Sequence, residues 1–126
     1  MSQRPRILLI DDDPSILELG QFILDRSGFD VDTATDGSVG WQALREKQYD
    51  AVVTDNLMPN VTGLALLKLM NDAKIRTPVI MITGTIPSSE FLRASHLQLE
   101  AILQKPVSVE QFLAILRPIV ARLPDR

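Results

Sequence analysis

The sequence of 126 residues contains no cysteine, a single histidine and a single tryptophan. Without cysteine, disulfides, thiolate metal sites and cysteine nucleophiles are excluded, which suits a reducing cytoplasm. No apolar run approaches the ~20 residues of a membrane span, and residues 1–6 are too short and too polar to open a signal peptide. The net charge of −3, without a basic stripe, argues against nucleic-acid binding. We therefore expect a cytoplasmic protein that binds neither membranes nor nucleic acids directly.

The length fits one compact domain and leaves no room for a second of ordinary size. No internal repeat, low-complexity tract or linker interrupts residues 6–122, and the hydrophobic content of 45% is enough for a core. We expect residues 1–126 to form a single domain with its core at about 6–122, and no effector domain after the last helix. The one histidine, His96, is expected to face solvent at a helix end rather than carry a phosphoryl group.

Apolar strand-like runs alternate with helical patterns along the whole chain. The first run, residues 7–10, is continuous rather than alternating, as expected for a strand that is buried on both faces. Five strand–helix units in strict alternation predict a doubly wound α/β fold with a five-stranded parallel sheet and helices on both faces. The predicted strands are 7–10, 30–33, 51–54, 78–82 and 101–104, and the helices that follow them are 14–27, 37–46, 63–71, 88–95 and 108–122.

The first helix carries local signals of both its ends, and three helices carry a predicted buried face. Asp13 can cap the first helix, Pro14 suits its first position, and Gly28 can end it. Apolar spacing predicts which side chains of the three most amphipathic helices point inward. These are Ile16, Leu19, Phe22 and Ile23 in the first, Val39, Ala43 and Leu44 in the second, and Phe112, Ile115, Leu116 and Ile119 in the last.

Polar residues follow the predicted strands at their carboxyl ends, where open α/β sheets bind ligands. Asp11 and Asp12 follow the first strand, Asp55 the third, Thr83 the fourth and Lys105 the fifth. If the first and third strands are neighbours, three carboxylates converge there with a hydroxyl and an ammonium group.

Such a cluster needs a cation. Two carboxylates ~4 Å apart repel by about 4 kcal/mol at an effective dielectric near 20, and one lysine cannot balance three of them. An all-oxygen site with open positions suits Mg²⁺. The metal, the lysine and the hydroxyl match the needs of phosphoryl transfer. Asp55 is the better nucleophile for an aspartyl phosphate, because Asp11 and Asp12 form a pair suited to hold the metal.

Four motifs together resemble the receiver domains of two-component response regulators. They are Ile-Asp-Asp-Asp-Pro at 10–14, Asp-Asn-Leu-Met-Pro at 55–59 with Gly63, Thr83-Gly84, and Lys105-Pro106. The resemblance covers about residues 6–122. It implies the flavodoxin-like strand order 2-1-3-4-5.

The resemblance also implies roles for individual residues. Asp55 matches the phosphoacceptor, Asp12 a direct ligand of Mg²⁺ (or Mn²⁺), and Asp11 its acidic partner. By the same resemblance, Asp55 would also be a metal ligand, and the backbone carbonyl of Leu57 would complete the shell. Thr83 matches the hydroxyl that moves toward the phosphoryl group and Lys105 the cation that pairs with it, whereas Pro106 matches a cis peptide.

A receiver would be a phosphorylation-dependent switch rather than an enzyme, and any self-catalysed step would act on its own Asp55. The implied donor is a sensor histidine kinase or a histidine phosphotransfer protein. The output would be a changed surface of the fourth helix, fifth strand and fifth helix. That face would bind an unknown protein target and could form a homodimer.

The sequence departs from the family pattern at a few positions. Ile102 stands where many members carry Tyr or Phe, and Val107 replaces a common Phe. Leu57 and Thr85 are not the acid or amide side chains that assist an attacking water, so slow self-dephosphorylation is expected.

One enzymatic alternative uses the same first motif. Asp11 to Ser15 also reads as Asp-x-Asp-x-Ser, which resembles a small haloacid-dehalogenase-like Mg²⁺ phosphatase that would use Asp11 and Asp13. That family needs a further acidic pair after Lys105, where only Glu110 and Asp125 remain. A flavodoxin-like cofactor-binding module fits less well, because three carboxylates would repel cofactor phosphates.

Overall fold

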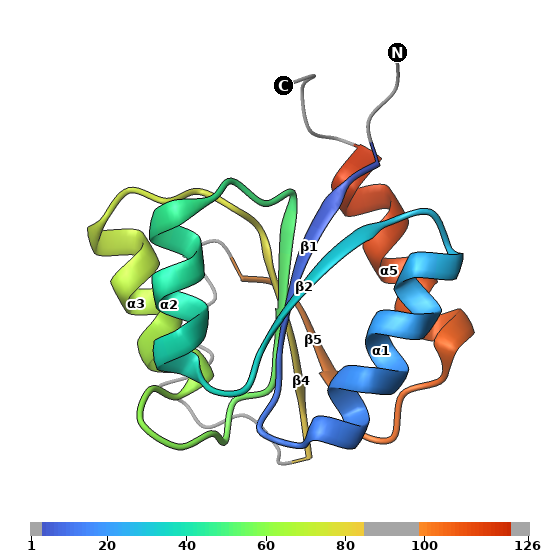
Figure 1. The fold of residues 1–126 in the computed structure, drawn as a ribbon, viewed down its shortest axis with the longest axis horizontal. Helices are drawn as coiled ribbons and strands as arrows, with labels where there is room; N and C mark the ends of the chain where they lie inside the picture. The colour runs from blue at the N-terminus through green and yellow to red at the C-terminus, as the bar shows by residue number, and fades with distance from the viewer. Residues whose placement is uncertain (1–3, 85–98, 122–126) are drawn as a thin grey trace.

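The computed structural model describes residues 4–84 and 99–121 (Figure 1). The predicted fourth helix at 88–95, His96 and Thr85 lie outside these residues. Within them, no helix is long and apolar enough to cross a membrane.

Five parallel strands form one sheet in the order β2-β1-β3-β4-β5, which confirms the predicted fold and strand order. The three central strands place β-branched and other apolar side chains on both faces, as their continuous apolar runs predicted. The strands are β1 (Arg6–Ile10), β2 (Asp30–Ala34), β3 (Ala51–Thr54), β4 (Val79–Thr83) and β5 (Leu99–Gln104).

Helices cover the two faces of the sheet in pairs (Figure 1). One face carries α1 (Pro14–Arg26) and α5 (Val109–Ala121), and the other carries α2 (Gly37–Glu46) and α3 (Gly63–Asp72). Alternate residues of β1 feed the two resulting cores, with Leu8 and Ile10 in one and Ile7 and Leu9 in the other. The sheet is therefore held between two apolar layers, and its strand ends are left for polar groups.

The helix boundary signals hold. The Asp13 side chain caps α1 by accepting a hydrogen bond from the Ser15 backbone N–H at 2.9 Å. Gly28 follows the C-cap with φ of +99°, a left-handed conformation that glycine adopts at little cost.

The predicted inward face of α1 is wrong for three of its four residues. Ile16, Leu19 and Phe22 are 40%, 60% and 57% exposed. The helix instead packs through Leu17 and Leu24, which are buried. Gly20 faces the sheet between them, and a Cβ atom there would lie 2.6 Å from a Leu9 methyl group. A glycine therefore marks the centre of the contact face, and the apolar stripe points away from the core.

The same effect appears on α2, where Val39 was also expected to face inward and is 45% exposed. Gly40 faces the sheet instead, and a Cβ atom there would lie 2.4 Å from the Ile10 Cδ1 atom. Leu44 is buried as predicted, and Ala43 packs against the same core. On α5 the predicted face is right: Leu116 and Ile119 are buried, and Phe112 and Ile115 pack beside them.

Candidate functional site

Adjacent strand ends bring the predicted acidic residues together. Ile10 of β1 is paired with Thr54 of β3, so Asp11 and Asp55 leave the sheet side by side. The Asp55 backbone N–H donates to the Ile10 carbonyl at 3.1 Å, which extends the strand pairing by one residue. The register of two buried strands thus sets the spacing of these two carboxylates.

Three carboxylates could share one cation at this edge. One oxygen each of Asp11, Asp12 and Asp55 lies within 4.8 Å of the others. Asp11 is 5% exposed, whereas Asp12 faces solvent. An all-oxygen donor set that is partly open to water is the kind of site that suits Mg²⁺.

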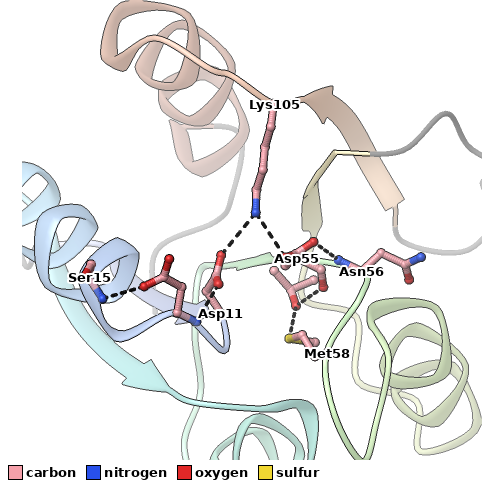
Figure 2. A network of polar contacts seen from close by, with 8 residues as sticks. Asp11, Ser15, Asp55, Asn56, Met58 and Lys105 are labelled. Carbon is pink, nitrogen blue, oxygen red and sulfur yellow. Dashed lines mark hydrogen bonds and ion pairs between the residues drawn. The ribbon is translucent and has the colours of Figure 1, made fainter.

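Lys105 reaches across from the end of β5 and contacts two of the carboxylates (Figure 2). Its Nζ atom lies 3.1 Å from Asp55 Oδ2 and 3.7 Å from Asp11 Oδ2. One ammonium group therefore pairs with two of the three carboxylates. The geometry leaves excess negative charge at the site, which a divalent cation would offset.

Burial acts in opposite directions on the pKa values of two groups of the site. Burial raises the pKa of Asp11, even though the Asp13 backbone N–H and the Lys105 charge act to lower it. Burial by itself lowers the pKa of Lys105, but the hydrogen bond to Asp55 and the charges of Asp11 and Asp55 outweigh it, so this pKa is raised. Lys105 therefore remains a cation at neutral pH.

The peptide that carries Asp55 is held by its own neighbours. The Asn56 backbone N–H donates to Asp55 Oδ1 at 2.7 Å, and the Thr54 hydroxyl donates to the Asp55 carbonyl at 2.8 Å (Figure 2). The same hydroxyl lies 3.7 Å from the Met58 sulfur, and both side chains are buried. One Asp55 oxygen is thus tied to the backbone while the other faces Lys105.

The first turn of α3 packs directly against this peptide. A Cβ atom at Gly63 would lie 2.7 Å from the Asp55 carbonyl oxygen and 3.0 Å from the Asn56 Cα atom, so only glycine fits without displacing backbone. The Asn56 side chain accepts a hydrogen bond from the Leu64 N–H at 3.0 Å. Asn56 was part of the motif at 55–59 but had no predicted role, although asparagine often bonds nearby backbone groups.

The remaining predicted residues lie around this cluster. Thr83 is the last residue of β4 and is buried, and its carbonyl accepts a hydrogen bond from the Lys105 N–H at 2.8 Å. The Lys105–Pro106 peptide bond is cis. The Leu57 side chain is 58% exposed, beside Asp55 in the chain.

Comparison with known proteins gives a consistent family. The response regulator receiver domain matches residues 7–117. The chain is 33% identical over 119 residues to the alkaline phosphatase synthesis transcriptional regulatory protein PhoP of Bacillus subtilis. This match covers 93% of the present chain and 49% of PhoP. It is 31% identical over 112 residues to the transcriptional regulatory protein DltR of Streptococcus agalactiae, with 89% and 50% covered. The chain thus spans about half the length of these relatives.

Solved structures agree with the sequence matches. The receiver domain of the Francisella response regulator 1452 superimposes with a TM-score of 0.86 at 26% identity, covering 94% of this chain and 98% of that chain. A CheY-like receiver domain protein from Methanospirillum hungatei gives a TM-score of 0.87 at 26% identity, covering 94% and 95%.

These relatives give no support to the dehalogenase-like alternative, and Asp13, which that chemistry would require, is engaged as the cap of α1. The family, the strand order and the acidic edge of the sheet point the same way. The chain belongs to the response regulator receiver domain family, and it is a phosphorylation-dependent switch of two-component signalling.

Proposed function

We propose that Asp55 accepts the phosphoryl group. The observation that carries this proposal is the convergence of Asp11, Asp12 and Asp55 beside Lys105, with Asp55 at the centre of the contacts. Asp55 is the carboxylate that contacts Lys105 most closely, so a phosphoryl group bound to its Oδ2 atom would form next to a cation. Phosphoryl transfer depends chiefly on such positioning and charge neutralisation.

The donor set of this edge fits Mg²⁺, or Mn²⁺ in its place. Asp11, Asp12 and Asp55 would hold the ion together with the backbone carbonyl of Leu57. When bound, the ion neutralises the carboxylates and polarises the phosphoryl oxygens. The chain itself supplies the fixed carboxylate geometry, because β1 and β3 are paired up to the residues that precede Asp11 and Asp55.

Lys105 and Thr83 would respond to the new charge. Lys105 can pair with the phosphoryl oxygens while keeping its place beside Asp55. Its backbone N–H is bonded to the Thr83 carbonyl, so the two residues are joined across β4 and β5. The Thr83 hydroxyl is proposed to move toward the phosphoryl group and to change the surface of β5 and α5. The same surface is predicted to include the fourth helix, at 88–95, outside the described residues. This face would contact the downstream protein target, which is unknown, or a second copy of the chain.

The phosphoryl donor is proposed to be the phosphohistidine of a sensor histidine kinase or a histidine phosphotransfer protein in the cytoplasm. In this step the P–N bond breaks, a P–O bond to Asp55 forms, and the imidazole leaves. Residues 1–126 would act as one receiver domain, with its core at about 6–122. The self-catalysed steps of the domain would be confined to its own Asp55.

The exposed stripe of α1 offers a place for that donor. An apolar groove with a volume of about 560 Å³ runs between α1 and the start of α5, and Asp55 and Lys105 line it as well. Ile16 and Leu19 lie on its wall, and exposed acidic side chains lie nearby at Asp12 and Asp13. A donor helix could place apolar side chains in this groove and basic side chains beside Asp12 and Asp13, and so bring its phosphohistidine to Asp55.

Mass spectrometry after incubation with acetyl phosphate and Mg²⁺ tests the phosphoacceptor. We expect one added phosphoryl group, which is lost in Asp55→Asn and in excess chelator. The matched control is Asp25→Asn, at an exposed carboxylate of α1. Undiminished labelling of Asp55→Asn would contradict the assignment.

A further inference from the structure

Asn56 is bonded both to Asp55 and to the first turn of α3. Its backbone N–H donates to Asp55 Oδ1 at 2.7 Å, and its carbonyl accepts from the Gly63 N–H at 2.9 Å. Its side-chain Oδ1 accepts from the Leu64 N–H at 3.0 Å. Both ends of this residue and its side chain are therefore engaged, and they connect the Asp55 carboxylate with the first turn of α3.

These bonds bear on the next peptide along the chain. The carbonyl proposed to contact the metal belongs to Leu57, whose side chain is exposed and gives its backbone no buried anchor. Asn56 is the residue before Leu57, and its bonds to Asp55, Gly63 and Leu64 hold the chain at that point. Because α3 is anchored in the core through Leu66 and Leu67, its first turn is a firm point of attachment.

We propose that Asn56 is a positioning residue for phosphorylation: its side-chain bond to α3 holds the Asp55 carboxylate and the Leu57 carbonyl in the geometry that binds the cation and accepts the phosphoryl group. This inference rests on the proposed function of Asp55. Partners that orient metal ligands without touching the metal commonly matter for both affinity and rate.

A purely structural role makes a different prediction, and the chain offers a matched control. Thr62 also caps α3, by accepting a hydrogen bond from the Ala65 N–H at 3.1 Å through its hydroxyl. Thr62→Val and Asn56→Leu each remove one side-chain cap of the same helix with little change in side-chain volume. Only Asn56 is bonded to Asp55 as well, so the two roles separate in this pair of variants.

The experiment measures the Mg²⁺ dissociation constant by calorimetry and the acetyl phosphate labelling rate at saturating Mg²⁺. Asn56→Leu should weaken Mg²⁺ binding and slow labelling by about tenfold each, the lower end for residues that orient metal ligands. Thr62→Val should lower the unfolding midpoint and leave both quantities at the wild-type value. Asn56→Asp keeps the acceptor oxygen and should restore the labelling rate.

Amide hydrogen exchange in chelator provides a readout without metal. The Leu64 amide should lose protection in Asn56→Leu and keep it in Asn56→Asp. If Asn56→Leu does not fold, Asn56→Ala takes its place in the same measurements. Labelling and Mg²⁺ binding equal to those of Thr62→Val would overturn the positioning role while leaving Asp55 as the phosphoacceptor. A wild-type protein that neither binds Mg²⁺ nor becomes labelled would overturn the proposed function itself.

Discussion

Two clusters of polar and charged residues, at opposite ends of the sheet, differ in how the charges of their carboxylates are balanced. The carboxyl-edge cluster comprises Asp11, Asp12, Asp55 and Lys105. The amino-edge cluster, near the starts of β1 and β3, comprises Arg6, Asp32, Lys47, Tyr49 and Asp50. Both clusters contain buried or half-buried acids, and both draw on residues distant in sequence.

In the amino-edge cluster, each carboxylate has its own donors. Asp50 Oδ2 accepts from the Arg6 backbone N–H at 2.7 Å. Asp32 Oδ2 accepts from the Tyr49 hydroxyl at 2.6 Å and lies 3.3 Å from Lys47 Nζ. The Tyr49 bond is the main cause that lowers the pKa of Asp32, and burial together with this bond raises the pKa of Tyr49. Charge here is matched locally.

In the carboxyl-edge cluster, three carboxylates lie close together, Lys105 pairs with only two of them, and burial raises the pKa of Asp11. Negative charge is therefore balanced at the amino edge of the sheet and is in excess at the carboxyl edge. Groups at the amino edge stabilise the native state, whereas groups at the carboxyl edge are held in an unfavourable arrangement that the proposed cation would relieve.

The largest expected effect is on the rate of Asp55 labelling, and it should distinguish Lys105 from Lys47. Lys105→Met should slow acetyl phosphate labelling of Asp55 by about 100-fold, the scale for removing one electrostatic stabiliser of a transition state. Lys47→Met removes a cation of the amino-edge cluster and should leave the rate unchanged. Phosphoprotein electrophoresis over time measures both. Equal rates for the two variants would mean that Lys105 does not act on the phosphoryl group.

Mg²⁺ should stabilise only the carboxyl edge. At a concentration of 100 times its dissociation constant, Mg²⁺ should raise the free energy of unfolding by about 2.7 kcal/mol. Urea unfolding with Mg²⁺ or with chelator measures the difference. Asp12→Asn should abolish most of it, whereas Asp32→Asn should retain it. A Mg²⁺ effect that survives in Asp12→Asn would place the ion elsewhere.

The same substitution should have opposite signs at the two ends in the metal-free protein. Asp11→Asn relieves like-charge contacts and should raise the free energy of unfolding by about 1 kcal/mol at neutral pH. Asp32→Asn weakens the hydrogen bonds to a charged group and should lower the free energy of unfolding. The loss should be only about 1 kcal/mol, because the Asp32 side chain is 44% exposed and solvent screens its charge. Urea unfolding in chelator decides the signs. Losses of equal size in both variants would remove the contrast between the clusters.

The smallest effect is the pH dependence of that contrast, again in chelator. The folded-state pKa of Asp11 is raised above 3.8, so its unfavourable contribution grows as the pH rises from about 3.8 through the folded value. The folded-state pKa of Asp32 is lowered, so its favourable contribution is present above 3.8 and is lost as the pH falls through the folded value. The increase in the free energy of unfolding from Asp11→Asn should therefore appear as the pH is raised. The decrease from Asp32→Asn should become smaller as the pH is lowered. Unfolding curves of both variants and wild type across this range test the two signs.

Much of the fold could be read from local patterns. Apolar runs identified four of the five strands to within two residues of their observed bounds, because buried parallel strands show no alternation. The more polar β2 (Asp30–Ala34) was predicted from the alternation of strands and helices. The position of Asp11, Asp55 and Lys105 immediately after such runs predicted that they would share one edge of the sheet. This inference needed only the rule that parallel strands end on the same side.

The sequence by itself therefore determined the strands, the alternation of elements and the residues at the strand ends. The tertiary structure decided which helix faces are buried and which backbone groups anchor the site. Periodicity ranks side chains by hydrophobicity, but Gly20 and Gly40 face the sheet at positions where a Cβ atom would meet Leu9 and Ile10. Three apolar residues of α1, Ile16, Leu19 and Phe22, are left exposed. Asn56 likewise acts through bonds to Gly63 and Leu64, whose amides reach it only once α3 has packed against the sheet.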